Sequence, residues 1–252
     1  MTVPQRILVT GGTRGIGAAT ADLLTASGAR VLVTARTAAD LGAIPLVAAD
    51  LATAAGAREV AAEVDRRLGG IDAVVHCVGN SFAKPGGTLA LDDDDWARVL
   101  DTNLMSAVRL DRLLAPRMVA QGRGAIVHVS SLQWKRPHES SPAYGPAKAA
   151  LTSYSKMLSA ELAPRGVRVN TVTPGFIATS GAERRIATIM AASGTTREAA
   201  ETELVASIGG VPLGRPGTAV EVAHVIAFAI SSAASYLCGA ELTVDGGNCR
   251  VL

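Results

Sequence analysis

The stretch "RILVTGGTRGIGAATADLLTASG" (residues 6–28) decides the fold. An apolar β-type run at 6–10 leads directly into the glycine-rich turn "TGGTRGIG" (10–17), and a helical pattern follows at 16–27. Glycines permit a tight turn and let the backbone approach a pyrophosphate closely, while the N-terminus of the next helix offers unpaired N–H groups and partial positive charge. A turn without a ligand is the alternative, but the strand before it and the helix after it favour a dinucleotide-binding unit.

The rest of the chain continues the alternation of strand and helix. Short apolar runs, typical of strands buried on both faces, predict six further strands, at 30–34, 44–50, 72–78, 125–131, 167–174 and 241–246. Helical patterns lie at 54–69, 94–121, 143–163 and 218–231. Such alternation indicates βαβ units. We therefore predict an α/β protein with a Rossmann-like, doubly wound parallel sheet of about seven strands, in a single domain spanning residues 1–252.

Charge and composition argue against several other classes of protein. The chain carries 24 Lys and Arg against 22 Asp and Glu, and it has no dominant basic tract, so a role on nucleic acid or on a membrane surface has little support. No apolar run reaches the roughly 18 residues that a membrane span needs, and the N-terminus lacks the pattern of a signal peptide. The three cysteines and four histidines show no disulfide or ligand spacing. We expect a cytoplasmic protein without a metal.

The acidic run at 92–95, within "LDDDDWARVL", invites a metal-site interpretation. Aspartates in the first turn of a helix also cap free N–H groups and complement the helix dipole. We expect the helix N-terminus rather than the metal.

A tyrosine and a lysine stand four residues apart in "SSPAYGPAKAAL" (140–151). At this spacing Tyr144 and Lys148 share one face of a helix. A nearby cation favours the phenolate and so lowers the pKa of a phenol, which would suit Tyr144 to proton transfer near neutral pH. Taken alone the pair is a weak signal, because a chance pair in an ordinary helix looks the same.

The order and spacing of six motifs make the chain recognisable. The turn reads Thr10-Gly11-x-x-x-Gly15-x-Gly17, "LDTNLMSA" holds Asn103, and Ser131 lies thirteen residues before Tyr144 of "YGPAK". "VNTVTPGFIAT" (169–179) and "LTVDGG" (242–247) complete the set. Together they resemble the short-chain dehydrogenase/reductase family over essentially the whole chain. One motif departs from the pattern: the family's Asn-Asn-Ala-Gly reads His76-Cys77-Val78-Gly79 here, which puts the local hydrogen bonding of the sheet centre in doubt.

The residues at the end of the second predicted strand indicate whether the cofactor is NAD or NADP. An acid there binds the 2′-hydroxyl of NAD, whereas arginine accommodates the 2′-phosphate of NADP. Residues 34–36 hold no carboxylate, and Arg36 and Arg14 can both approach the phosphate, so we predict NADP(H). Asp50 matches the family's acid beside the adenine ring. The resemblance assigns the cofactor site to Gly11, Thr13, Arg14, Gly15, Ile16, Gly17, Arg36, Asp50, Leu51, Gly79, Tyr144, Lys148, Pro174, Gly175, Ile177 and Thr179.

The resemblance also implies a mechanism and four catalytic residues. Tyr144 would be the general acid in ketone reduction and the base in alcohol oxidation. Lys148, with the nicotinium charge, would lower the pKa of Tyr144 and hold the nicotinamide ribose. Ser131 would bind the substrate oxygen, Asn103 a water that connects Lys148 to solvent, and Thr179 the carboxamide. The alternatives are a reductase of C=C or C=N bonds and a non-enzymatic NADP-sensing regulator, and the intact residues Ser131, Tyr144 and Lys148 favour carbonyl chemistry.

Substrate contacts and assembly are less visible in the sequence. We expect Ser131, Trp134, Tyr144 and Phe176 to bind the substrate, with Phe82 as a further apolar wall. The resemblance makes 180–215 a substrate lid and suggests a homotetramer, with a dimer second, through the helices at 94–121 and 143–163. A basic rim would suit a ketone with an anionic group, unless these cations are simply solvated. Its members are Lys135, Arg136, His138, Arg184 and Arg185.

Overall fold

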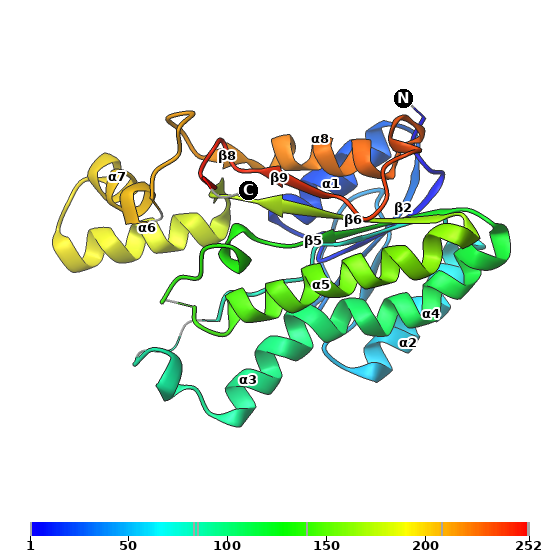
Figure 1. The fold of residues 1–252 in the computed structure, drawn as a ribbon, viewed down its shortest axis with the longest axis horizontal. Helices are drawn as coiled ribbons and strands as arrows, with labels where there is room; N and C mark the ends of the chain where they lie inside the picture. Colours follow the sequence, from blue (N-terminus) through cyan, green and yellow to red (C-terminus); the bar gives the residue numbers. More distant parts are fainter. Residues whose placement is uncertain (1, 83, 85, 140, 208, 251–252) are drawn as a thin grey trace.

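Seven parallel strands form one sheet at the centre of the molecule (Figure 1). The structure is a computed structural model, and it describes residues 2–250 except 83, 85, 140 and 208. The strands follow the order β3-β2-β1-β4-β5-β6-β9. Their bounds are β1 Arg6–Thr10, β2 Arg30–Ala35, β3 Leu46–Ala48, β4 Ala73–His76, β5 Gly124–Val129, β6 Val167–Pro174 and β9 Glu241–Val244. All seven predicted strands are confirmed, and so is the doubly wound class.

Helices cover both faces of the sheet, as the near-continuous apolar strands require (Figure 1). One face packs against α1 (Gly15–Ala26) and α8 (Ala219–Ile230), and the other packs against α2 (Ala54–Leu68) and α4 (Ser106–Gln121). Next to α4 lies α5 (Tyr144–Leu162). The strand order reverses between β1 and β4, and in open α/β sheets ligands bind outside the carboxyl ends of the strands at such a switch point. The glycine-rich turn follows β1 at this place.

The predicted helix at 94–121 is three segments in the structure. It consists of α3 (Asp93–Leu100), a π-helical segment (Asp101–Met105) and α4. The acidic run begins α3 as expected: Oδ1 of Asp92 accepts a hydrogen bond from the backbone N–H of Asp95 at 2.8 Å, and Oδ2 of Asp95 accepts one from the N–H of Asp92 at 3.3 Å. The capping interpretation of this run is therefore confirmed. The π-helical turn has no signal that we detected in the sequence, and such turns occur frequently at functional sites.

Beyond the carboxyl edge of the sheet, α6 (Ser180–Ser193) and α7 (Arg197–Ser207) form a separate helical pair (Figure 1). They pack on each other through Ile186, Ala200 and Leu204. The segment that holds α6 and α7 begins and ends in a two-stranded parallel sheet, in which β7 (Ile177–Ala178) pairs with β8 (Gly217–Thr218). Within the described part of the chain, no helix is both long and apolar enough to span a membrane.

Candidate active site

The turn after β1 has the geometry of a phosphate cradle. A side chain at Gly17 would place its Cβ 2.3 Å from the carbonyl oxygen of Gly11, so only glycine lets the helix start this close to the strand. Helix α1 begins with Arg14 as N-cap, and among the described residues no side chain caps it. In contrast, Thr53 caps α2 and Thr218 caps α8. The first N–H groups of α1 therefore stay available for an anionic ligand.

The sheet centre is fastened despite the missing asparagine. The Oγ1 atom of Thr10 accepts hydrogen bonds from the backbone N–H groups of Cys77 at 3.1 Å and Val78 at 3.4 Å. Thr10 thus joins the end of β1 to the segment after β4. Burial raises the pKa of the Cys77 thiol to about 12, so this cysteine is a neutral packing residue. The local hydrogen bonding that the sequence placed in doubt is in this way supplied by Thr10.

The segment after β6 lies against the glycine-rich turn. Gly15 has a φ of 55°, and a Cβ there would lie 3.6 Å from Cγ2 of Thr179. The chain reaches this point from Pro174 through Gly175, whose N–H donates to the carbonyl of Val244 at 3.0 Å. Residues of the predicted cofactor site that are about 160 positions apart in the sequence are thus neighbours. Ile177, on the same segment, is buried.

The residues predicted to contact the adenosine half lie after β1, β2 and β3. Arg14 and Arg36 are exposed, and neither side chain has a hydrogen bond or ion pair among the described residues. Asp50 follows β3, and its Oδ1 accepts from the N–H of Ala52 at 3.0 Å, while the next residue, Leu51, is buried. Thr13 and Ile16 of the turn are partly buried. All of these residues lie at the carboxyl edge of the sheet.

Ser131, Tyr144 and Lys148 meet at the same edge. Ser131 follows β5, and its hydroxyl forms a hydrogen bond with that of Tyr144, the first residue of α5. One turn later, Nζ of Lys148 lies 5.8 Å from the centroid of the Tyr144 ring and donates to the carbonyl of Val129 at 2.9 Å. The lysine side chain is 2% exposed. Three of the four predicted catalytic residues are therefore brought together from the end of β5 and the start of α5.

Burial has the largest effect on the pKa values of Tyr144 and Lys148. Burial raises the pKa of Tyr144, and the hydrogen bond with Ser131 only partly opposes this. Nζ of Lys148 bonds to Val129 and lies over the ring, and the predicted lowering of the Tyr144 pKa by Lys148 together with the nicotinium charge stays a prediction. Burial also lowers the pKa of Lys148 to about 8, which makes its charge responsive to its surroundings near neutral pH.

The π-helical segment positions Asn103 beside this group. Its amide donates to the carbonyls of Asn80 at 3.1 Å and Val99 at 2.9 Å, and its Oδ1 accepts from the N–H of Asn80 at 3.0 Å. A Cβ at Gly79 would lie 3.3 Å from both Oδ1 of Asn103 and Nζ of Lys148. Glycine at this position therefore keeps open the space that both polar groups face.

Comparison with known proteins supports the family resemblance that the sequence motifs indicated. Residues 11–248 match the family described as enoyl-(acyl carrier protein) reductase. A putative ketoacyl reductase of the monensin polyketide synthase from Streptomyces virginiae is 38% identical over an alignment of 254 residues that covers 95% of each chain. The 3-oxoacyl-(acyl-carrier-protein) reductase FabG from Salmonella typhimurium is 33% identical over an alignment of 250 residues that also covers 95% of each chain. The chain is a short-chain dehydrogenase/reductase.

A solved structure supports both the family and the fold. L-Sorbose reductase from Gluconobacter frateurii, complexed with NADPH and L-sorbose, superposes with a TM-score of 0.93 at 29% identity, covering 100% of this chain and 99% of that one. The predicted family and enzyme class, an oxidoreductase that exchanges hydride between a nicotinamide cofactor and a carbonyl or alcohol carbon, are confirmed.

Next to Ser131, this short-chain dehydrogenase/reductase has a hollow of about 150 Å³. Phe176 lines it as predicted, together with Gly175, Arg136, His138 and Arg185. Two expected wall residues lie elsewhere. The indole N–H of Trp134 donates to Glu241 at 2.9 Å, and Phe82 packs beneath the guanidinium of Arg98.

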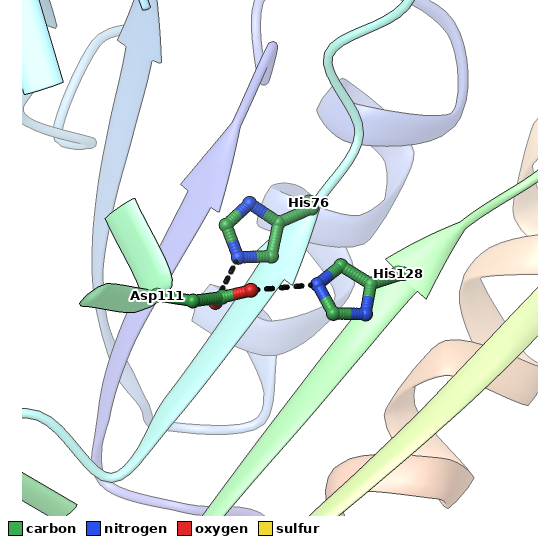
Figure 2. Close-up of side chains that lie close together, drawn as sticks. All are labelled: His76, Asp111 and His128. Carbon is green, nitrogen blue, oxygen red and sulfur yellow. Dashed lines mark hydrogen bonds and ion pairs between the residues drawn. The ribbon is translucent and has the colours of Figure 1, made fainter. Parts of the chain in front are cut away.

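A buried polar cluster behind the active site was not predicted (Figure 2). Asp111 of α4 accepts hydrogen bonds from Nε2 of His76 at 2.8 Å and Nε2 of His128 at 2.9 Å, and from the hydroxyl of Tyr154 at 3.1 Å. His76 and His128 are paired in register on β4 and β5. The cluster thus joins two central strands to α4 and α5.

The hydrogen bonds decide how this cluster is interpreted. Its ligand atoms lie within 4.8 Å of one another, a spacing that could also hold a metal ion. However, Nδ1 of His128 is buried without a partner among the described residues. A metal at Nε2 would move the proton to Nδ1, where no acceptor is found, whereas an Nε2–H that donates to Asp111 leaves Nδ1 as an acceptor. The geometry therefore favours a hydrogen-bonded cluster, in which burial lowers the pKa of His128 and keeps it neutral.

Proposed function

We propose that this protein reduces a ketone with NADPH, with Tyr144 as the proton donor. The observation that carries this proposal is the meeting of Ser131, Tyr144 and Lys148 at the same edge of the sheet as the glycine-rich turn. The cofactor, when bound, supplies the hydride. Ser131 holds the carbonyl oxygen within reach of the Tyr144 hydroxyl, which delivers its proton as charge develops on that oxygen. Lys148 and Asn103 restore the proton through water in the space beside Gly79.

A panel of ketones offered with NADPH tests this function. Loss of NADPH absorbance with formation of the matching alcohol supports it. Tight binding of NADPH without turnover on any ketone would instead identify a regulator. The family description names an enoyl reductase, so enones belong in the panel. We expect reduction at the carbonyl, because Ser131 is placed to bind an oxygen.

NADPH should bind at least about tenfold more tightly than NADH, a difference of about 1.4 kcal/mol. The exposed and unpaired guanidiniums of Arg14 and Arg36 can pair with the 2′-phosphate, and a phosphate fits such a planar donor. Arg36→Asp should narrow or reverse the preference. Titration calorimetry with both cofactors measures it, and Arg58→Asp, an exposed arginine on α2, is the matched control. Equal dissociation constants in the unmutated protein would rule out the assignment.

The remaining proposals concern the cellular location of the enzyme, its oligomeric state and its substrate lid. We infer a cytoplasmic homotetramer in which α4 and α5 pair between subunits and residues 180–215 act as a lid on the substrate. The apolar side chain of Met157 on α5 is 70% exposed in the single chain. This supports a contact between subunits at that surface, because such a contact would bury it. Light scattering would contradict the assembly if it gave a stable mass of 25.7 kDa, that of one chain.

A further inference from the structure

Arg185 is an unusual arginine in this protein. It is one of six arginines that are partly buried among the described residues. The other five each bond to a carboxylate or a backbone carbonyl; they are Arg6, Arg67, Arg109, Arg117 and Arg168. For Arg185 the described residues provide no hydrogen bond or ion pair. Every other unpaired arginine is exposed, where water solvates the charge. Among the residues that the structure describes, Arg185 alone is an arginine that combines partial burial with a side chain that has no partner.

A partly desolvated cation without a partner is unfavourable, because burial removes water and nothing replaces it. Burial also lowers the pKa of Arg185, and no neighbouring charge opposes this effect. The position is nevertheless fixed by packing, since the next residue, Ile186, is 4% exposed and contacts Ala200 and Leu204 of α7. The described side chains therefore offer no partner for a guanidinium whose position on the helix is fixed by packing.

Arg185 faces the space next to the catalytic serine. It lines the 150 Å³ hollow that also contains Ser131 and Phe176, and a second hollow of about 200 Å³ that it shares with Ser207. At the rim of the first hollow, Nη1 of Arg136 donates to the carbonyl of Asn248 at 3.0 Å. None of the described residues that line this first hollow is a carboxylate. Glu203 lines the second one, but it is exposed and forms no ion pair with Arg185.

We propose that Arg185, assisted by Arg136, binds an oxyanion of the substrate, so that the enzyme reduces a ketone that carries a carboxylate or a phosphate. This inference rests on the proposed carbonyl reduction, because it places the anion in the hollow that begins at Ser131. A guanidinium fork matches the oxygens of both groups and can bind either in bidentate fashion. The sequence named Arg184 equally, but Arg184 is exposed and does not line the hollow.

Matched substrate pairs test the anion site. Methyl levulinate lacks the negative charge of levulinate and is larger by one methyl group, and dihydroxyacetone lacks the phosphate of dihydroxyacetone phosphate. The anion of at least one pair should have a KM at least about tenfold below that of its neutral partner, as expected for a hydrogen bond to a charged group. Whichever pair shows the difference identifies the oxyanion. Equal KM values within both pairs would overturn the proposal.

Variants assign the effect to Arg185. Arg185→Ala should raise the KM for the preferred anion about tenfold and leave the KM of the neutral partner unchanged, whereas Arg185→Lys should restore part of the difference. Arg184→Ala removes the same charge one residue away on the same helix and should change neither value. If Arg184→Ala and Arg185→Ala have equal effects, the site is only a general positive field and the proposal fails.

A binding measurement separates this inference from the proposed reaction. Valerate has a carboxylate but no ketone, so calorimetry reports its binding without turnover. Binding that Arg185→Ala abolishes would support the anion site even if no ketone were reduced, in which case the reaction alone would be wrong. Ketone reduction with no preference for anions and no binding of valerate would leave the reaction standing and contradict the anion site.

Discussion

Tyr144→Phe should lower turnover by about 10²–10⁴-fold while NADPH still binds. The substitution keeps the ring that Lys148 faces and removes the one hydroxyl that shares a hydrogen bond with Ser131. The proton then has no donor beside the substrate oxygen. Steady-state rates with NADPH give the loss, and quenching or enhancement of cofactor fluorescence gives the binding.

A contrasting variant shows that the loss belongs to the hydroxyl. Lys148→Ala should weaken both turnover and cofactor binding, because Lys148 faces the same open space as Asn103 beside Gly79. Tyr154→Phe removes a phenol from the same helix outside the catalytic group, so its rate should stay within a few-fold of the original. Near-normal turnover by Tyr144→Phe would show that Tyr144 is not the acid.

Asp111→Ala should lower the free energy of unfolding by about 3–5 kcal/mol, because each buried donor left without its acceptor costs about 1–3 kcal/mol. Three donors, from His76, His128 and Tyr154, would lose their shared acceptor inside the protein. Urea denaturation measures the change. Asp65→Ala is the control: Asp65 pairs with Arg117 at 2.6 Å on the surface, where such pairs contribute about 0–1 kcal/mol. Similar losses for the two variants would contradict the role of the cluster.

The same cluster gives stability a definite dependence on pH. Burial lowers the folded-state pKa of His128, so the folded protein resists protonation that the unfolded chain accepts below about 6.5. The contribution of His128 is therefore complete above that pH and is lost as the pH falls further. The folded-state pKa of Asp111 is lowered too, by the two histidines against the effect of burial, so its contribution is lost only in stronger acid. The urea concentration at the unfolding midpoint should decrease as the pH is lowered below about 6.5. It should decrease less in His128→Asn.

Local patterns in the sequence predicted most of the fold and the glycine-rich turn that is shaped to bind a phosphate. Strand, turn and helix follow one another without a gap at residues 6–26, and the glycines are explained by the close approach of Gly17 to Gly11. Ser131 and Tyr144 are likewise close in the sequence, because a single connection leads from the end of β5 to the start of α5. Features of this kind are fixed by neighbours in the chain, so spacing alone reveals them.

The features that the sequence missed depend on contacts between distant residues. His76 and Asp111 are 35 positions apart and His128 follows 17 later, so no ligand spacing could indicate their cluster. Trp134 follows Ser131 closely, but Glu241 on β9 holds its indole away from the hollow. Arg184 and Arg185 look alike in sequence, and only the rotation of α6 decides which of them is partly buried.

The effect of Lys148 on the pKa of Tyr144 is hard to predict from the sequence for a related reason. The spacing of four residues correctly predicted that both lie on one face of α5, but it could not show that Nζ is engaged by Val129 of a neighbouring strand. Nor could it show how strongly burial acts on both groups. The direction of a pKa shift depends on the whole surroundings of a group, which the fold determines.

The most direct test of the central claim is transfer of deuterium from NADPH labelled at the C4 position of the nicotinamide. With a ketone that the enzyme accepts, mass spectrometry and NMR of the product should find one deuterium on the carbon that bears the new hydroxyl. That result would establish hydride transfer to a carbonyl carbon next to Ser131 and Tyr144. Deuterium on a former C=C or C=N carbon, or tight NADPH binding with no label transferred to any ketone, would contradict the assignment.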